Sequence, residues 1–401
     1  MQIVAADKRL QTVLADKRWA EKYPEMGTGP VSAEPLISEE HFELEREKVF
    51  RRTWLNIGRV EEVQNPGDYI ARDLAICNAS VLIIRGKDGQ VRGFHNVCSH
   101  RGNKVIWDEK GSCKGSITCG FHAWSYNTKG ALTWVPDEDN FFDLPKCDLG
   151  LAPIHTDVFE GFIFIHLADT PNESLREYLG GVADLLEGGG FSELALMGQY
   201  KIDEHANWKV ALDAQNELYH LPFQHRRTIP QFCVMKDGKY TRLLDVRLFN
   251  HHSVYSSESP ADRVGPATEK LAIQFSVAET EYRLPRIGPF DFYTIFPNMA
   301  LLLFQGVSHD YYMTYNFWPN AVNQTDWDIK LYCRPAENAG QRVGQEYFKC
   351  LLRDLLQEDA TAHEQIHIGL ASRAKKELYF QDDEMQIRYF HKVLERFYAE
   401  A

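Results

Sequence analysis

The chain has 401 residues, of which 44% are hydrophobic and 25% are charged, a composition typical of a globular protein large enough for two domains. Asp and Glu number 57 against 44 Lys and Arg, giving a net charge of -13, so we expect neither nucleic acid nor an anionic membrane as a partner. There is no apolar run long enough to span a membrane, and the charged N-terminal stretch is unlike a signal peptide. We therefore expect a cytoplasmic protein, in which eight cysteines suggest metal binding rather than disulfides.

The first fifty residues have helical periodicity. Residues 5–21 place apolar side chains along one side, and a second helix should begin after Ser38, an N-capping residue followed by two acids. From Trp54, short strand-like runs separated by Gly- and Asn-containing turns predict a β-rich module. We therefore divide the chain into a helical segment (1–51) that packs on the C-terminal domain, a β-rich domain (52–166) and a C-terminal domain (167–401).

The C-terminal domain is predicted to contain both helices and strands. Helices are expected over residues 174–186, 208–220, 341–374 and 383–398, and strands over 243–249, 292–296, 300–304, 311–317 and 328–333. A group of strands followed by two long helices predicts an α+β domain with an antiparallel sheet.

Two short loops of the β-rich domain each carry one cysteine and one histidine. Cys98 and His100 form the first pair, and Cys119 and His122 form the second. Two thiolates and two imidazoles on facing loops are the ligands of a [2Fe–2S] cluster with cysteines on one iron and histidines on the other. A structural zinc site accepts the same donors and is the alternative. Two further cysteines fit neither loop and are expected to be buried thiols: Cys113 and Cys147.

A second constellation lies in the C-terminal domain. His220 and His225 flank Pro222, so we expect His220 to end a helix and His225 to lie just beyond the break. Two histidines and one carboxylate form the facial triad of non-haem Fe(II) oxygenases. The expected source of the carboxylate is the pair Glu358 and Asp359 in the long helix.

The two cysteine–histidine loops resemble the Rieske motif, specifically that of Rieske non-haem iron oxygenases. Respiratory Rieske proteins carry an extra disulfide-forming cysteine in each loop, and this sequence has Asn103 and Phe121 at those places. In the second loop, Gly120 and Ala123 stand where the oxygenases usually have Pro and Gly. The chain therefore resembles a catalytic (alpha) subunit of the aromatic ring-hydroxylating dioxygenase family.

The histidine motif also resembles the catalytic signature of that family. The resemblance implies a helix-grip catalytic domain whose mononuclear Fe(II) is held by His220, His225 and Asp359. It further implies that Glu217 joins His220 to the cluster ligand His122 of a neighbouring subunit in a homotrimer. A separate NAD(P)H reductase, with or without a ferredoxin, would supply electrons, because the sequence has no dinucleotide-binding glycine motif of its own. A small beta subunit is a further partner in some members.

The leading hypothesis is a terminal oxygenase that hydroxylates an aromatic or apolar substrate, with cis-dihydroxylation as the expected reaction. The alternative is a monooxygenase or demethylase of an N-methyl, O-methyl or quaternary-ammonium substrate, because Glu217 replaces the Asp found in many ring-hydroxylating members. A Rieske electron-transfer protein is the alternative from another class. Candidate pocket residues are Phe223, Phe232, Phe292, Phe296 and Phe304. Candidate residues of an aromatic cage for a cation are Trp208, Tyr219, Phe304 and Trp318.

Overall fold

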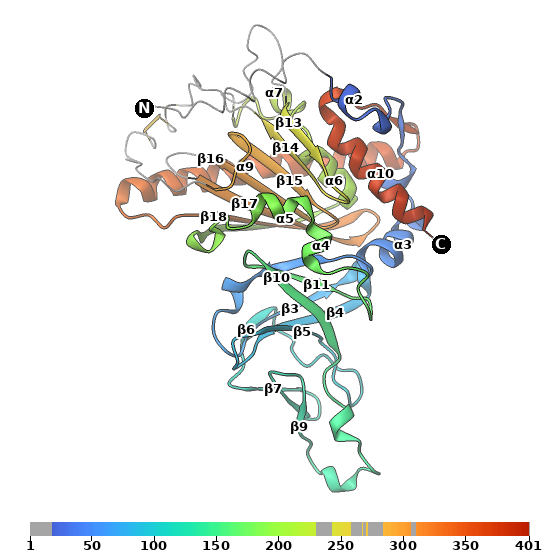
Figure 1. The fold of residues 1–401 in the computed structure, drawn as a ribbon, viewed down its shortest axis with the longest axis vertical. Helices are drawn as coiled ribbons and strands as arrows, with labels where there is room; N and C mark the ends of the chain where they lie inside the picture. The colour runs from blue at the N-terminus through green and yellow to red at the C-terminus, as the bar shows by residue number, and fades with distance from the viewer. Residues whose placement is uncertain are drawn as a thin grey trace. The chain divides into compact units, whose positions relative to one another are not determined.

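The computed structural model describes residues 18–229, 243–257, 284–305 and 310–400, with isolated positions at 267, 270 and 271. The chain forms two compact units, shown in Figure 1. One unit is Arg46–Tyr178, and the other combines the chain up to Glu45 with the chain from Leu179 onward. The sequence placed the corresponding boundaries at 51/52 and 166/167. Phe232 lies outside the described residues, as does most of the first predicted helix.

The unit Arg46–Tyr178 is built from antiparallel strands. Its larger sheet has seven strands in the order β2 (Leu55–Arg59), β11 (Phe162–His166), β10 (Pro153–Phe159), β5 (Val91–His95), β4 (Ala79–Arg85), β3 (Asp68–Leu74) and β6 (Lys110–Ser112). A smaller sheet contains β7 (Ser116–Thr118), β8 (Ser125–Asn127) and β9 (Leu132–Trp134). One core cluster of this unit includes Cys98 and Cys119 together with Trp124 and Tyr126, so the two predicted ligand loops are anchored in packed side chains.

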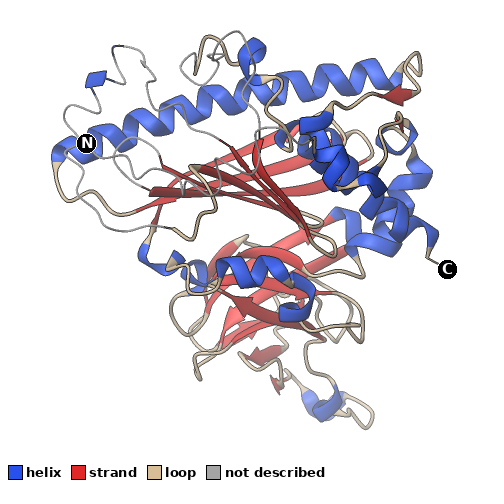
Figure 2. Ribbon diagram, turned by 45° about the horizontal axis from the view of Figure 1, so that its top comes forward, coloured by secondary structure: helices blue, strands red, loops and turns tan. Residues whose placement is uncertain are grey.

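The other unit is organised around a second antiparallel sheet of seven strands. Their order is β12 (Ala195–Glu204), β18 (Gln324–Cys333), β17 (Asp310–Ala321), β16 (Met299–Gln305), β15 (Phe290–Ile295), β14 (Ser253–Ser257) and β13 (Leu243–Leu248). The long helix α9 (Ala339–Ala371) runs along one face of this sheet, as Figure 2 shows. The Tyr200 hydroxyl donates to the carbonyl of Lys349 at 2.7 Å, and the rings of Phe304 and Phe348 lie 5.7 Å apart. This α+β, helix-grip arrangement confirms the predicted fold class.

The N-terminal segment is tied to the C-terminal helices of the same unit. The helix α2 (Trp19–Lys22) contacts the turn before α10 (Met385–Ala399), where the Trp19 indole donates to Asp383 at 3.1 Å. Strand β1 (Val31–Ser32) pairs with β19 (Glu377–Leu378). As predicted, Ser38 caps the next helix, α3 (Glu39–Leu44), by accepting the His41 N–H.

Several predicted boundaries were wrong. The helix expected over 174–186 is divided into α4 (Leu175–Leu179) and α5 (Gly181–Leu186), because Gly180 adopts a positive φ of 48°. The helix expected over 208–220 ends at Gln215. Strands β12 and β14 were not predicted, since a register shift between Leu196 and Gly198 interrupts the alternation of β12 and β14 is rich in serine. Within the described ranges, no helix has both the length and the apolar character needed to cross a bilayer.

Candidate metal centres

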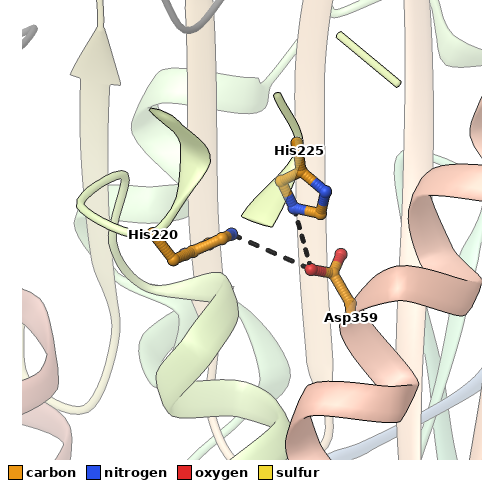
Figure 3. A group of neighbouring side chains, drawn as sticks. All are labelled: His220, His225 and Asp359. Atoms are coloured by element: carbon orange, nitrogen blue, oxygen red, sulfur yellow. Dashed lines mark ion pairs between the residues drawn. The ribbon is translucent and has the colours of Figure 1, made fainter. Parts of the chain in front are cut away.

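His220, His225 and Asp359 converge on one point between α9 and the loop after α6 (Trp208–Gln215) (Figure 3). The Asp359 Oδ1 lies 3.0 Å from Nε2 of His225 and 3.8 Å from Nε2 of His220. One potential ligand atom from each residue falls within 4.8 Å of the others. His225 and Asp359 are buried, whereas His220 is half-buried. The three residues that the sequence singled out are therefore brought together.

The short helix α7 (Leu221–Gln224) sets the spacing of the two histidines. Pro222 lies in its first turn, where the missing N–H of proline leaves no backbone acceptor unsatisfied. His220 occupies the N-cap of this helix and His225 its C-cap. The expectation that His220 ends the preceding helix was thus wrong, since four residues separate it from the end of α6 at Gln215.

Each histidine has a carboxylate behind its ring. Glu217 Oε1 makes a short hydrogen bond with Nδ1 of His220, and Glu217 Oε2 accepts the His220 backbone N–H at 3.1 Å. Glu358 Oε2 lies 2.8 Å from Nδ1 of His225, while Thr228 donates to the other Glu358 oxygen. A carboxylate on Nδ1 fixes the proton there and leaves Nε2 as the metal-binding atom. The sequence did not predict the role of Glu358, although its position next to Asp359 was visible.

The Asp359 carboxylate is held in its charged form. Burial opposes ionisation, but the hydrogen bond and charge of His225, with the charge of His220, outweigh it and keep the pKa of Asp359 below its usual value. The Gln224 side-chain amide also donates to Asp359 Oδ1 at 3.0 Å. The same oxygen therefore faces both imidazoles and one neutral donor.

These residues fit a divalent iron ion. The Nε2 of His225 is buried and lies 3.0 Å from Asp359 Oδ1, so the two ligand atoms face the same point, as a shared metal ion requires. Two neutral imidazoles and one carboxylate are the donor set of non-haem Fe(II) oxygenases, in which the remaining positions bind O2 and solvent.

The loops of the other unit bring the two predicted histidine ligands together, and Cys119 is hydrogen-bonded to Cys98. The His100 and His122 rings lie 4.6 Å apart, and His100 stacks on Trp124 at 4.8 Å. Each loop is closed by its own cysteine: the Gly102 N–H donates to the Cys98 carbonyl at 2.9 Å, and the Ala123 N–H donates to that of Cys119 at 3.0 Å.

The sulfur and nitrogen atoms of these loops suit an iron–sulfur cluster. Burial opposes ionisation of Cys119, but the backbone N–H of Phe121 and the Asn103 amide outweigh it and lower the pKa of the thiol. The Nδ1 of His100 is buried without a hydrogen-bond partner among the described residues. Asn103, which stands where respiratory Rieske proteins have a disulfide cysteine, instead donates to Cys119 Sγ at 3.5 Å.

The departures from the usual second loop have different structural consequences. A Cβ at Gly120 would make only ordinary contact with Trp107, at 3.6 Å. Ala123, in contrast, adopts a φ of 58°, a conformation that favours glycine. Of the two cysteines expected to be buried thiols, Cys113 is half-buried and Cys147 is exposed, so the prediction for Cys147 was wrong.

The aromatic residues proposed for a substrate site are only partly placed there. Trp208 is fully buried, and its indole donates to Glu45 at 2.7 Å, so it is not available to a ligand. Phe223 and Tyr219 are exposed. Phe292 stacks on Tyr255 at 5.4 Å, and its ring lies 6.5 Å from that of Tyr315.

Tyr255 and Tyr315, which sequence reasoning missed, adjoin the triad. Burial and then the charge of Glu217 raise the pKa of Tyr255 well above its usual value, and burial and then Asp359 do the same for Tyr315. Phe292 pairs directly with Tyr255 across β14 and β15, so their side chains share one face of the sheet. The alternation of side chains between the two faces of these strands was the sequence signal that could have identified the two tyrosines.

Two family models match the chain. Residues 191–400 match the ring hydroxylating alpha subunit (catalytic domain), and residues 53–152 match the Rieske [2Fe-2S] domain. The chain belongs to the family of Rieske ring-hydroxylating oxygenase alpha subunits. It therefore combines a Rieske domain, which holds a [2Fe–2S] cluster, with a catalytic domain that binds mononuclear iron in this family. A simple electron carrier is not supported, because such a protein needs no catalytic domain.

This alpha subunit is similar to several characterised oxygenases. It is 33% identical over 185 residues to the carnitine monooxygenase oxygenase subunit of Acinetobacter baumannii, covering 46% of this chain and 49% of that protein. It is also 33% identical over 184 residues to the glycine betaine monooxygenase oxygenase subunit of Pseudomonas aeruginosa, covering 46% of this chain and 42% of that protein. The matched segment thus spans about half the length of these relatives or less. A 2-aminobenzenesulfonate 2,3-dioxygenase alpha subunit from an Alcaligenes species is 33% identical over 197 residues, or 47% of this chain and 48% of that protein.

Solved structures of two kinds of oxygenase share the fold of this alpha subunit. A quaternary ammonium Rieske monooxygenase bound to L-carnitine is similar, with a TM-score of 0.75 and 22% identity, over 94% of this chain and 97% of that one. Naphthalene 1,2-dioxygenase from a Rhodococcus species has a TM-score of 0.76 and 21% identity, over 98% and 99% of the two chains. The fold alone does not separate monooxygenation from dioxygenation.

Proposed function

We propose that the protein is the terminal oxygenase of a Rieske system that hydroxylates a carbon bonded to the nitrogen of a quaternary-ammonium compound. The observation that carries this proposal is the Glu217–His220 pair, with glutamate where many ring-hydroxylating members have aspartate. The similarity to carnitine and glycine betaine monooxygenases supports it independently. The proposal replaces aromatic cis-dihydroxylation, which the sequence first favoured, by the alternative considered beside it.

In this proposal His220, His225 and Asp359 hold the iron, and Cys98, His100, Cys119 and His122 hold the cluster. When bound, the iron supplies the site at which O2 is activated with electrons from the cluster. Glu217 and Glu358 keep the two imidazoles oriented, with their Nε2 atoms directed at the metal. Glu217 acts as a positioning residue and not as an iron ligand.

In this proposal the tyrosine- and phenylalanine-lined face of the sheet would form a wall of the substrate site once its buried rings are uncovered. Tyr255, Phe292 and Tyr315 are buried aromatic residues, and Tyr255 and Tyr315 interact electrostatically with Glu217 and Asp359 respectively. Aromatic faces and nearby carboxylates attract an ammonium group that cannot donate hydrogen bonds. Because these three aromatic residues lie on paired strands, they would hold the substrate carbon next to nitrogen toward the iron and exclude water.

The overall reaction balances with two electrons and two protons. The substrate C–H bond and O2 give C–OH and one water. The N–C bond of the hydroxylated product then breaks, leaving a tertiary amine, an aldehyde and one proton. The electrons would come from NAD(P)H through a separate reductase, with or without a ferredoxin.

A head-to-tail homotrimer would connect the two centres between neighbouring chains. Aromatic side chains are exposed at both ends of the proposed route: Phe121 and Trp107 at the cluster loops, and Tyr219 and Phe223 beside His220. Exposed apolar groups of this kind are typical of interaction surfaces. We propose that His122 of one chain meets Glu217 of the next.

The test measures turnover of the purified protein with a competent reductase on a panel of matched candidate substrates. Each quaternary-ammonium compound is paired with its uncharged carbon analogue, and simple arenes are added. We expect an aldehyde and a tertiary amine from charged members only. Cis-dihydrodiols from arenes without amine release would instead establish the aromatic dioxygenase that the Alcaligenes relative suggests.

A further inference from the structure

Three fully buried side chains near the iron site each have one polar atom that no described residue pairs. His363, on α9, contacts Glu204 at the end of β12, with 3.2 Å between His363 Nδ1 and Glu204 Oε1. The ring of Trp327, on β18, lies 5.7 Å from that of His363. Glu204 Oε2, His363 Nε2 and Trp327 Nε1 are all buried, and none has a hydrogen-bond partner among the described residues. We call these residues the Glu204 cluster.

The secondary structure explains why the Glu204 cluster adjoins the triad. Ile202 pairs with Trp327 across β12 and β18, and alternate residues of a strand share a face, so Glu204 lies on the same side as Trp327. His363 follows Asp359 by four residues, which places both on one side of α9. Tyr315, whose pKa is raised by burial and then by Asp359, packs against Trp327 at 4.9 Å.

The three unsatisfied atoms have the donor and acceptor character that a bound water molecule would match. Glu204 Oε2 accepts hydrogen bonds, Trp327 Nε1 only donates them, and His363 Nε2 does either according to its tautomer. A water molecule can donate to the carboxylate and accept from the indole, and buried water typically makes about three such bonds. A metal ion does not suit the set, because an indole N–H has no lone pair to offer. An apolar ligand would leave all three atoms unpaired.

The Glu204 cluster lies beside the protein surface. His205, which follows Glu204, donates its backbone N–H to Glu364 Oε1 at 3.1 Å. His205 is exposed and Glu364 is partly exposed, so a boundary with water lies one residue from Glu204. The charged and titratable groups that face His363 are Glu204 from β12 and Asp359 from its own helix, with His367 one turn further. His367 in turn lies near Lys209 of α6.

We propose that the Glu204 cluster binds internal water and serves as a proton inlet to the iron site. The inference rests on the proposed oxygenase function, which consumes two protons and two electrons for each O2 when C–H is converted to C–OH and water. A proton from solvent would pass by Glu204, the bound water and His363 to the region of Asp359. The electrons would arrive separately, through the reductase and the [2Fe–2S] cluster. The proposed inlet would therefore carry protons and no electrons.

The first part of the test is structural and independent of substrate. A crystal structure at high resolution should contain ordered water within hydrogen-bonding distance of at least two of the three unpaired atoms. A dry cluster, with the three groups paired to other side chains, would overturn the inference. This result does not depend on which compound the enzyme oxidises.

The second part separates proton delivery from structural support. Glu204→Gln keeps the shape and the contact with His363 but cannot carry a proton, and Glu346→Gln, at an exposed position of α9, is the control. We expect Glu204→Gln to keep its iron content, cluster EPR spectrum and melting temperature. Its single-turnover product formation should fall about 100-fold or more, with more peroxide released and a larger solvent deuterium isotope effect.

The outcomes are distinguishable. Wild-type rate and isotope effect in folded Glu204→Gln would overturn the proton inlet. If that variant fails to fold, His363→Gln takes its place under the same criteria. Absence of product from the wild-type protein would instead contradict the proposed function, and the water experiment would still decide whether the Glu204 cluster is hydrated.

Discussion

Glu358 and Asp359 are consecutive in sequence, yet their carboxylates contact opposite nitrogens of the same imidazole. Glu358 Oε2 lies 2.8 Å from Nδ1 of His225, and Asp359 Oδ1 lies 3.0 Å from its Nε2. Successive helix positions are rotated by about 100°, so two neighbouring acids of α9 can reach both sides of one ring. Asp359 is positioned to bind the metal, and Glu358 is positioned to orient His225.

Glu358→Gln should weaken iron binding without displacing His225. The amide can still contact Nδ1, but it carries no charge to raise the basicity of the imidazole. Loss of such an outer partner typically lowers metal affinity about 10- to 100-fold. Titration of the metal-free protein with Fe(II) under anaerobic conditions measures the change. Asp354→Asn, at an exposed position of the same helix, is the control. Equal affinity in both variants would contradict the assigned role of Glu358.

Glu217→Gln should separate reduction of the cluster from reactivity at the iron. The variant keeps the Rieske ligands, so the cluster should reduce at the wild-type rate with an unchanged spectrum. Reoxidation of the reduced cluster by O2 in the presence of substrate should be slower, because the proposed connection between subunits is weakened. Stopped-flow absorbance of the cluster follows both steps. Unchanged turnover would remove Glu217 from the electron route.

Much of the iron site could be predicted from the sequence, because His220, His225 and Asp359 fall in motifs with fixed spacing. The supporting residues were less visible. Tyr255 and Tyr315 look like ordinary core residues until strand pairing places them beside the triad. Trp208 was a candidate for an aromatic cage around a cation, but it is fully buried and its indole is hydrogen-bonded to Glu45. Such roles depend on contacts between residues far apart in the sequence, such as Trp208 and Glu45 at 163 positions, which no local pattern encodes.

Cys119→Ser should abolish the Rieske spectrum. The serine hydroxyl ionises far less readily than a thiol, and Cys119 is a thiol whose pKa is already lowered by its surroundings. We expect loss of the characteristic visible absorption and EPR signals, with bound sulfide falling in parallel. Cys147→Ser is the matched control, since Cys147 is exposed and outside both loops. An unaltered spectrum in Cys119→Ser would contradict the assignment of the cluster.

Ala123→Gly should stabilise the Rieske domain. Ala123 has a φ of 58°, and a left-handed conformation costs a residue with a Cβ roughly 1–2 kcal/mol. Greater freedom of glycine in the unfolded chain offsets part of the gain, so we expect about 1 kcal/mol. Thermal unfolding of the cluster-loaded protein, followed by the loss of visible absorption, measures the effect. Gly102→Ala, at a φ of 76°, should shift the transition in the opposite direction. A lower melting temperature for Ala123→Gly would show that this loop is not strained.

The most direct test of the proposed chemistry is a single turnover with labelled oxygen. Fully reduced protein, without reductase, would be mixed with ¹⁸O₂ and a quaternary-ammonium substrate such as carnitine or glycine betaine. Products would be trapped rapidly and read by mass spectrometry. The account predicts one labelled oxygen in the aldehyde product and an equivalent of tertiary amine. Two labelled oxygens in a cis-diol from an arene, with no amine released from any charged substrate, would contradict it.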